Sequence, residues 1–167
     1  MKQINLLAVT IFLLVFYGCG GVKNTAEKSS SKSDKATYKI NTIAFYNLEN
    51  LFDTEDDPQK KDEYSPIMEM AESEREEIYQ KKLANMAEVI PKIGVDQAKQ
   101  PPAVIGVCEL ENYKVLQDLV NQEALQPYDY EIVHYDSPDE RSIDVALLYR
   151  SSVFRVMHSQ PYEVVLY

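Results

Sequence analysis

The sequence predicts an α/β fold, and three features of the chain point to it. Residues 103–107 are an unbroken run of small and β-branched residues between Pro101-Pro102 and Glu109, which is typical of a buried strand covered on both faces. A helix pattern follows at once, with an apolar stripe formed by Val115, Leu116, Leu119 and Val120. Two more strand patterns, at residues 38–48 and 143–149, flank this unit, so the chain favours a sheet with helices packed on it.

Length and charge narrow the class of protein. The 167 residues carry a formal net charge of −10, and 45% of them are hydrophobic. This length suits one domain with its own core, and the hydrophobic fraction argues against disorder for most of the chain. From residue 38 onward, 12 Lys and Arg residues stand against 25 Asp and Glu residues, which leaves −13. Because phosphate binding is carried mostly by Lys and Arg, this balance argues against a basic nucleic-acid groove.

Residues 1–19 are similar to a bacterial lipoprotein signal peptide. Lys2 precedes an apolar run from Ile4 to Tyr17, and Gly18-Cys19 closes it. The run is shorter than the roughly 20 residues that a membrane span needs. We expect Cys19 to be the lipidation site, with a cleaved secretory peptide or an uncleaved anchor as the alternatives. Residues 20–37, rich in Ser and Lys, are then a flexible tether that holds a domain at 38–167 on a membrane of the cell envelope, at its periplasmic side or at the cell surface.

The first strand of the domain is expected at Tyr38 to Leu48, and it ends at a pair of asparagines. Asn47 and Asn50 sit among apolar residues, which indicates a loop that is packed down while it presents its amides. The alternative is that each Asn satisfies its own turn.

An acidic insertion and a helix follow. Residues 53–77 carry eleven carboxylates against Lys60, Lys61 and Arg75. The run from Asp53 to Asp57 suggests calcium, but it lacks the Gly and the spaced ligands of an EF-hand loop, so a solvated acidic segment is favoured. A capping box of Ser73 and Glu76 predicts the start of an amphipathic helix whose buried face holds Tyr79, Leu83, Met86 and Ile90. Pro91 and Gly94 end this helix, and residues 95–102 form a linker.

Glu109 is the first candidate binding residue, because it ends the central strand. In α/β sheets ligands bind beyond the carboxyl ends of strands, where a side chain is exposed and still held by a rigid element. The alternative is that Glu109 caps the next helix, whose first-turn N–H groups favour a carboxylate. Cys108, inside the apolar run, is expected to be a small buried side chain rather than a nucleophile. With Cys19 lipidated, it is the only remaining thiol, so no disulfide is expected.

The rest of the chain continues the α/β pattern. The expected elements are a helix at about 112–122, a strand at 128–135, a turn at 136–141, a strand at 143–149, and extended pieces at 154–157 and 162–167. The last piece is apolar and has no turn after it. Because an exposed edge of this kind invites aggregation, we expect further residues beyond Tyr167.

Three segments together resemble the endonuclease/exonuclease/phosphatase superfamily, metal-dependent phosphoesterases with a DNase-I-like fold. Residues 43–48 look like the family's first strand with its active-site Asn, here Asn47, and residues 103–109 look like the strand that ends in its metal-binding Glu, here Glu109. Residues 137–150 are similar to a segment of secreted and lipoprotein members, which usually have Gly where this chain has Ser142. The resemblance implies the N-terminal half of a four-layer α/β/β/α sandwich, incomplete at its C-terminus.

The resemblance also implies a site. Glu109 and Asn47 would hold Mg²⁺ or Mn²⁺ and act in catalysis, while Arg141 and Asn50 would bind the phosphoester substrate. Mg²⁺ takes only one or two carboxylates and keeps several waters, so a single Glu is chemically adequate. Arg141 can contact a phosphate bidentately, and a surface ion pair with Asp139 or Glu140 is the alternative.

The family's remaining catalytic elements, an Asp-x-Asn segment and an Asp-His pair, have no counterpart in this chain. His134 and His158 are its only histidines, and we expect His134 to face a neighbouring strand and His158 to lie in a loop. The function expected is therefore phosphoester hydrolysis, by a nuclease or phosphatase that is inactive as this chain alone. A non-catalytic, lipid-anchored binding module or a truncated-gene remnant is the alternative. The acidic balance favours a small or lipid phosphodiester over nucleic acid, and no protein partner is expected.

Overall fold

The fold consists of a mixed sheet with helices on one face. A computed structural model of the chain describes residues 38–162. All of these belong to a single unit of the chain. The expected signal peptide with Cys19, the expected tether and the end of the last expected extended piece, at 163–167, lie outside the described residues. Among the helices at 38–162, none is both long enough and apolar enough to cross a bilayer.

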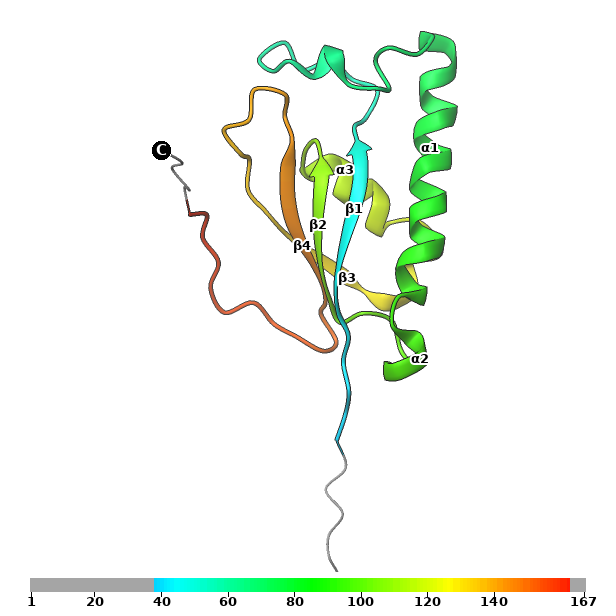
Figure 1. The fold of residues 1–167 in the computed structure, drawn as a ribbon, viewed down its shortest axis with the longest axis vertical. Coiled ribbons are helices and arrows are strands. Elements are labelled where there is room, and N and C mark those ends of the chain that lie inside the picture. The colour runs from blue at the N-terminus through cyan, green and yellow to red at the C-terminus, as the bar shows by residue number, and fades with distance from the viewer. Residues whose placement is uncertain (1–37, 163–167) are drawn as a thin grey trace, which may run out of the picture. The chain divides into compact units, whose positions relative to one another are not determined.

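The sheet has four strands in the order β1-β2-β4-β3 (Figure 1). β1 (Ile43–Leu51) runs parallel to β2 (Val104–Leu110), and β2 pairs antiparallel with β4 (Asp144–Arg150). β3 (Tyr130–His134) lies antiparallel to the outer side of β4. The central position of β2 agrees with its apolar composition, because an inner strand is hydrogen-bonded along both edges. The predicted α/β class is confirmed.

Two helices cover one face of this sheet. α1 (Glu72–Val89) and α3 (Tyr113–Val120) bury their apolar stripes in a single core with every second residue of the strands. A four-residue helix, α2 (Val95–Ala98), lies in the stretch expected to be a plain linker. Short 3₁₀ turns occupy Asp62–Tyr64, Ile90–Lys92 and Gln126–Tyr128. The core on this face includes the predicted helix residues Tyr79, Leu83, Met86 and Ile90, together with Ile105, Val107, Val115, Leu116, Leu119 and Leu148.

The opposite face of the sheet carries exposed apolar side chains. Ile43, Phe45 and Val145 are 77%, 72% and 64% exposed, and they alternate with residues that are wholly or partly buried against the helices. Gly106 makes room for the Phe45 ring, since a Cβ at that position would lie 2.7 Å from Phe45 Cδ2. The expectation that the central strand is covered on both faces therefore holds for one face only. One helical layer packed on one sheet agrees with part of a DNase-I-like domain.

Two local predictions are wrong. α1 begins at Glu72 after Ala71, and no side chain caps it, so Ser73 and Glu76 do not form a capping box. Instead Arg75 donates to the carbonyls of Met68 and Met70 and fixes the preceding turn from within the helix. Residues 154–157 do not join the sheet, because the chain turns at 151–153 directly after β4.

Candidate metal and phosphoester site

The parallel strands β1 and β2 both become irregular at their carboxyl ends, side by side. Their register is regular up to the pair Asn47 and Cys108, and it resumes only at Leu51 and Leu110. The pairing of β2 with β4 shifts at the same place, between Cys108 and Leu110. Glu109 is the residue left over, so the bulge turns a side chain at the end of an inner strand out of the normal alternation.

Three residues at this edge adopt a backbone conformation that L-residues avoid. The φ angles are 49° at Glu49, 56° at Asn50 and 57° at Glu109. Each such residue costs on the order of 1–2 kcal/mol and persists only when surrounding contacts impose it. Lys99, Asp129 and Ser142 also have positive φ, but only at this edge do three such residues lie at the ends of two paired strands.

Asn47 and Glu109 are directly hydrogen-bonded. Asn47 Nδ2 donates to Glu109 Oε1 at 2.8 Å, and Asn47 Oδ1 accepts from the backbone N–H of Glu49 at 2.6 Å. The second bond fixes which way the amide points, because its oxygen is already engaged. Among residues 38–162, no donor is bonded to the other Glu109 oxygen, Oε2. The two residues predicted to share a site therefore do lie together.

Glu109 does not cap the following helix. Asn112 is the N-cap of α3, and its side-chain oxygen accepts from the N–H of Val115 at 3.1 Å. The alternative explanation for Glu109 is thus wrong, since the capping position is filled three residues later.

Lys82 of α1 hydrogen-bonds to the strained backbone at this sheet edge. Its Nζ donates to the carbonyl oxygens of Glu49 and Asn50 at 2.6 Å and 2.8 Å. Burial lowers the pKa of Lys82, while the nearby charges of Glu49 and Glu109 act in the opposite direction. Lys82 is not among the candidate residues expected from the sequence. Lys82 lies three residues after the buried Tyr79, on the border of the apolar stripe. This position is the feature of the sequence that could have indicated a role for Lys82.

Beside this edge, Asn50 and Arg141 line the same pocket, of about 250 Å³. Its other lining residues are Phe52, Lys61, Tyr64, Ser65, Pro66 and Ile143. Two cationic side chains and the buried Ser65 hydroxyl, which lacks a hydrogen-bond partner, give this pocket the character of an anion site.

Both cations of the pocket are paired with carboxylates. Arg141 Nη2 lies 3.1 Å from Asp139 Oδ2, and this hydrogen bonding lowers the pKa of Asp139. Lys61 pairs with Glu140, and the Lys61 N–H donates to the Glu140 carbonyl at 2.8 Å. The ion pair foreseen as the alternative for Arg141 is therefore present, in an exposed setting where an incoming anion can compete for the guanidinium.

Ser142 follows these residues with a φ of 61°. This left-handed conformation gives a physical reason for the Gly that the resembling proteins usually carry there. Ser142 is buried, and its hydroxyl donates to the Glu111 carbonyl at 3.4 Å.

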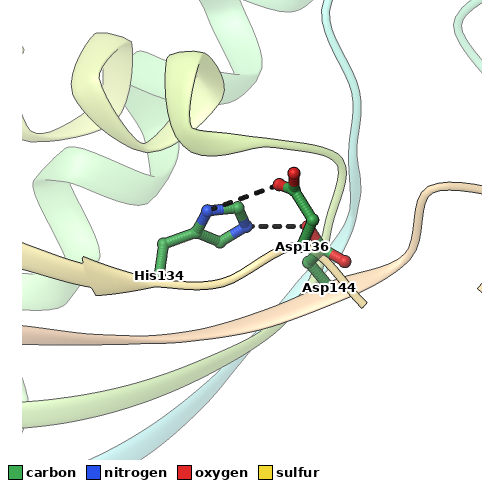
Figure 2. Close-up of side chains that lie close together, drawn as sticks. All are labelled: His134, Asp136 and Asp144. Atoms are coloured by element: carbon green, nitrogen blue, oxygen red, sulfur yellow. Dashed lines mark hydrogen bonds and ion pairs between the residues drawn. The ribbon is translucent and has the colours of Figure 1, made fainter. Parts of the chain in front are cut away.

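His134 lies in a separate polar cluster (Figure 2). Its Nε2 is 2.7 Å from Asp144 Oδ2, and its Nδ1 is 3.9 Å from Asp136 Oδ1. His134 pairs with Ala146, which pairs with the buried Val107, so it lies on the helix-covered face of the sheet. The prediction that His134 faces a neighbouring strand is confirmed. His158, near Gln160, is exposed. Within the described part of the chain, neither histidine is hydrogen-bonded to Glu109 or Asn47.

Glu111, two residues after Glu109, is a buried carboxyl that the sequence did not single out. It is 4% exposed, and its Oε2 accepts from the Asp53 N–H at 2.8 Å. Burial raises the pKa of Glu111 to about 7. Lys114 sits nearby, 3.1 Å from the buried carboxylate of Asp53. Cys108 is partly exposed rather than buried, and burial together with the Glu109 charge raises its pKa, which agrees with a thiol that is not a nucleophile.

The residues at the strand ends fit a hard divalent cation. Glu109 offers one oxygen that is oriented by Asn47 and one that is free for a metal, and Mg²⁺ accepts such a minimal set because water completes its shell. Two carboxylate-rich groups elsewhere, His134 with Asp136 and Asp144, and Asp56 with Asp62 and Glu63, also bring possible ligands within 4.8 Å of one another.

Fold and site together define an α/β domain with a hydrogen-bonded carboxylate and amide at two strand ends and a pocket with two cationic side chains beside them. A family model for the endonuclease/exonuclease/phosphatase family matches residues 42–167, and the chain belongs to this family. Its members are typically dependent on divalent metals. Comparison with curated proteins gave no match, and comparison with solved structures gave none either.

Proposed function

We propose that this chain supplies the Asn and Glu of a metal-dependent phosphoesterase site, which hydrolyses phosphodiester or phosphomonoester bonds. The observation that carries the proposal is the 2.8 Å hydrogen bond between Asn47 and Glu109, made at two strand ends that are strained in the same place. Glu109 and Asn47 would hold Mg²⁺ or Mn²⁺. The ion, when bound, would polarise the phosphoryl oxygen and neutralise the charge that develops there.

The chain's own residues would divide the remaining work. Asn47 holds Glu109 Oε1, so the carboxylate needs no reorientation when a cation or a phosphate arrives. Lys82 locks the carbonyls of Glu49 and Asn50 and keeps the bulge in place. Arg141, released from Asp139, would bind a substrate oxygen in the pocket that it shares with Asn50.

Residues 38–162 do not provide a histidine at this site that could act as general base for the attacking water. His134 is engaged by Asp144 on the other face of the sheet. We therefore propose that these residues alone bind metal but turn over substrate slowly or not at all. This same observation favours a second candidate, a binding module without catalysis.

The proposal is tested with a longer form of the protein that includes any sequence after Tyr167, assayed with Mg²⁺ and bis-nitrophenyl phosphate. Glu109→Gln should abolish turnover, because it removes the charged ligand and keeps the size. The exposed Glu123→Gln is the matched control and should retain wild-type rates. Full activity in the Glu109 variant would remove this residue from the metal site. A wild-type protein that binds Mn²⁺ but shows no turnover would favour the non-catalytic module.

We also propose that the domain is held at the membrane by a lipid on Cys19, which rests on the apolar run and the Gly18-Cys19 pair. Cys19→Ala should move the protein from the membrane fraction to the soluble fraction. An unchanged distribution would favour an uncleaved anchor.

A further inference from the structure

The loop between β1 and α1 gathers carboxylates at a second place, away from Glu109. Asp56, Asp62 and Glu63 each bring one carboxylate oxygen within 4.8 Å of the others. Asp56 and Glu63 are exposed, whereas Asp62 is 1% exposed. Two oxygens bound to one Ca²⁺ can be at most about 5 Å apart, twice the usual Ca–O distance. The spacing of this cluster therefore allows all three residues to bind one ion together.

One oxygen of the buried Asp62 carboxylate has no partner. Oδ2 accepts the N–H of Asp57 at 2.8 Å, whereas Oδ1 is buried and makes no hydrogen bond. An ionised oxygen that is removed from water without a donor is strongly disfavoured unless a cation compensates it. This unpaired atom is independent of the clustering, and it indicates that a ligand is part of the site.

No Lys, Arg or His at residues 38–162 forms an ion pair with this cluster, although the charge of Lys61 also acts on Glu63. Lys61 pairs with Glu140, and Lys114 pairs with Asp53 and Glu55. Asp56, Asp62 and Glu63 thus form a concentration of negative charge without an ion pair to a Lys, Arg or His in the described part of the chain.

We propose that Asp56, Asp62 and Glu63 form a Ca²⁺ site. The donors are all oxygens, which excludes the nitrogen and sulfur preferences of zinc and copper. Ca²⁺ takes six to eight oxygens in flexible geometry and draws on backbone carbonyls and water, as an irregular loop with one 3₁₀ turn can supply. Mg²⁺ demands a near-ideal octahedron and is the poorer fit. The acidic run that lacks the spacing of an EF-hand becomes a site because residues 62 and 63 fold back on residue 56.

The site has a consequence for its neighbours. Asp62 and Glu63 lie between Lys61 on one side and Tyr64 and Ser65 on the other, and these three residues line the pocket that also holds Arg141. An ion on Asp62 would hold this turn in place and so order one wall of the pocket. The Ca²⁺ site itself does not depend on phosphoester chemistry.

Terbium luminescence tests the proposal on the full chain. Tb³⁺ replaces Ca²⁺ at oxygen sites, and Tyr64, next to Glu63, is placed to sensitise its emission. The wild-type protein should give saturable emission on tyrosine excitation that Ca²⁺ displaces at lower concentration than Mg²⁺. Asp62→Asn, Asp56→Asn and Glu63→Gln should each weaken Ca²⁺ competition by at least about tenfold, because each removes a charged ligand.

Two controls separate this site from the others. Glu69→Gln lowers the charge of the same segment equally at an exposed residue outside the cluster and should bind as the wild type does. Glu109→Gln should keep the Ca²⁺-displaceable signal. The Ca²⁺ proposal can therefore hold even if the proposed metal site at Asn47 and Glu109 is disproved. Since Asp56 and Glu63 are exposed, their variants will fold even if the Asp62 variant does not. Wild-type affinity in the Asp56 and Glu63 variants, no saturable signal, or preferential displacement by Mg²⁺ would overturn the proposal.

Discussion

The buried carboxyl of Glu111 should make the domain less stable as the pH rises through the acidic range. Its pKa is 4.5 in an unfolded chain and about 7 in the folded protein, so the folded state holds the proton more tightly. Because the folded pKa is the higher one, the contribution to stability is complete below pH 4.5 and is lost between pH 4.5 and 7. A difference of about 2.5 pKa units corresponds to about 3 kcal/mol at most.

Replacing Glu111 by Gln tests this directly. The amide oxygen still accepts the Asp53 N–H, and no charge has to be buried at neutral pH. We expect the free energy of unfolding in urea, followed by circular dichroism from pH 4.5 to 8, to fall less steeply than in the wild type. At pH 8 the variant should be the more stable protein by up to about 3 kcal/mol. Glu123→Gln, at an exposed position, should leave the slope unchanged. Equal slopes for wild type and Glu111→Gln, or a less stable variant at pH 8, would refute the reasoning.

Two further predictions concern the strained backbone around the site. Ser142→Gly should stabilise the domain by up to about 1 kcal/mol, since the left-handed φ of 61° suits Gly. Ser142→Val should destabilise it by about 2 kcal/mol, because a β-branched residue is strained at this φ. Urea unfolding measures both changes, and a stabilising effect of Val would contradict the prediction. Lys82→Met should cost about 1–3 kcal/mol in the same assay, because the carbonyls of Glu49 and Asn50 lose their donor; an unchanged midpoint would show that Lys82 does not hold the bulge.

Local patterns predicted the elements well where periodicity and burial agree. Tyr79, Leu83 and Met86 form the buried side of α1, and the run that ends at Glu109 forms the inner strand β2. Both were predictable because the spacing of apolar residues indicates which face of an element packs. The predicted capping box is absent, since contacts from Arg75 to the preceding loop fix where α1 begins. The extended piece predicted at 154–157 does not join the sheet, because strand propensity does not report a turn that leads the chain away from the sheet.

The candidate site was predictable only in part. Asn47 and Glu109 were singled out by the strand ends on which they lie and by the resemblance to a family, whereas the pairing of those two strands came from the structure. The bulge, the role of Lys82 and the raised pKa of Glu111 arise from tertiary contacts between segments far apart in the sequence. The charge cluster at Asp62 is also of this kind, since no linear spacing of ligands reveals a turn that folds back on itself.

Mn²⁺ binding followed by electron paramagnetic resonance tests the central claim most directly, because it needs no catalytic turnover. The account predicts that Glu109→Gln loses the tight Mn²⁺ population, that Asn47→Ala weakens it, and that the double variant binds no worse than Glu109→Gln alone. Glu123→Gln should bind as the wild type does. Unaltered Mn²⁺ binding in the Glu109 variant would contradict the account.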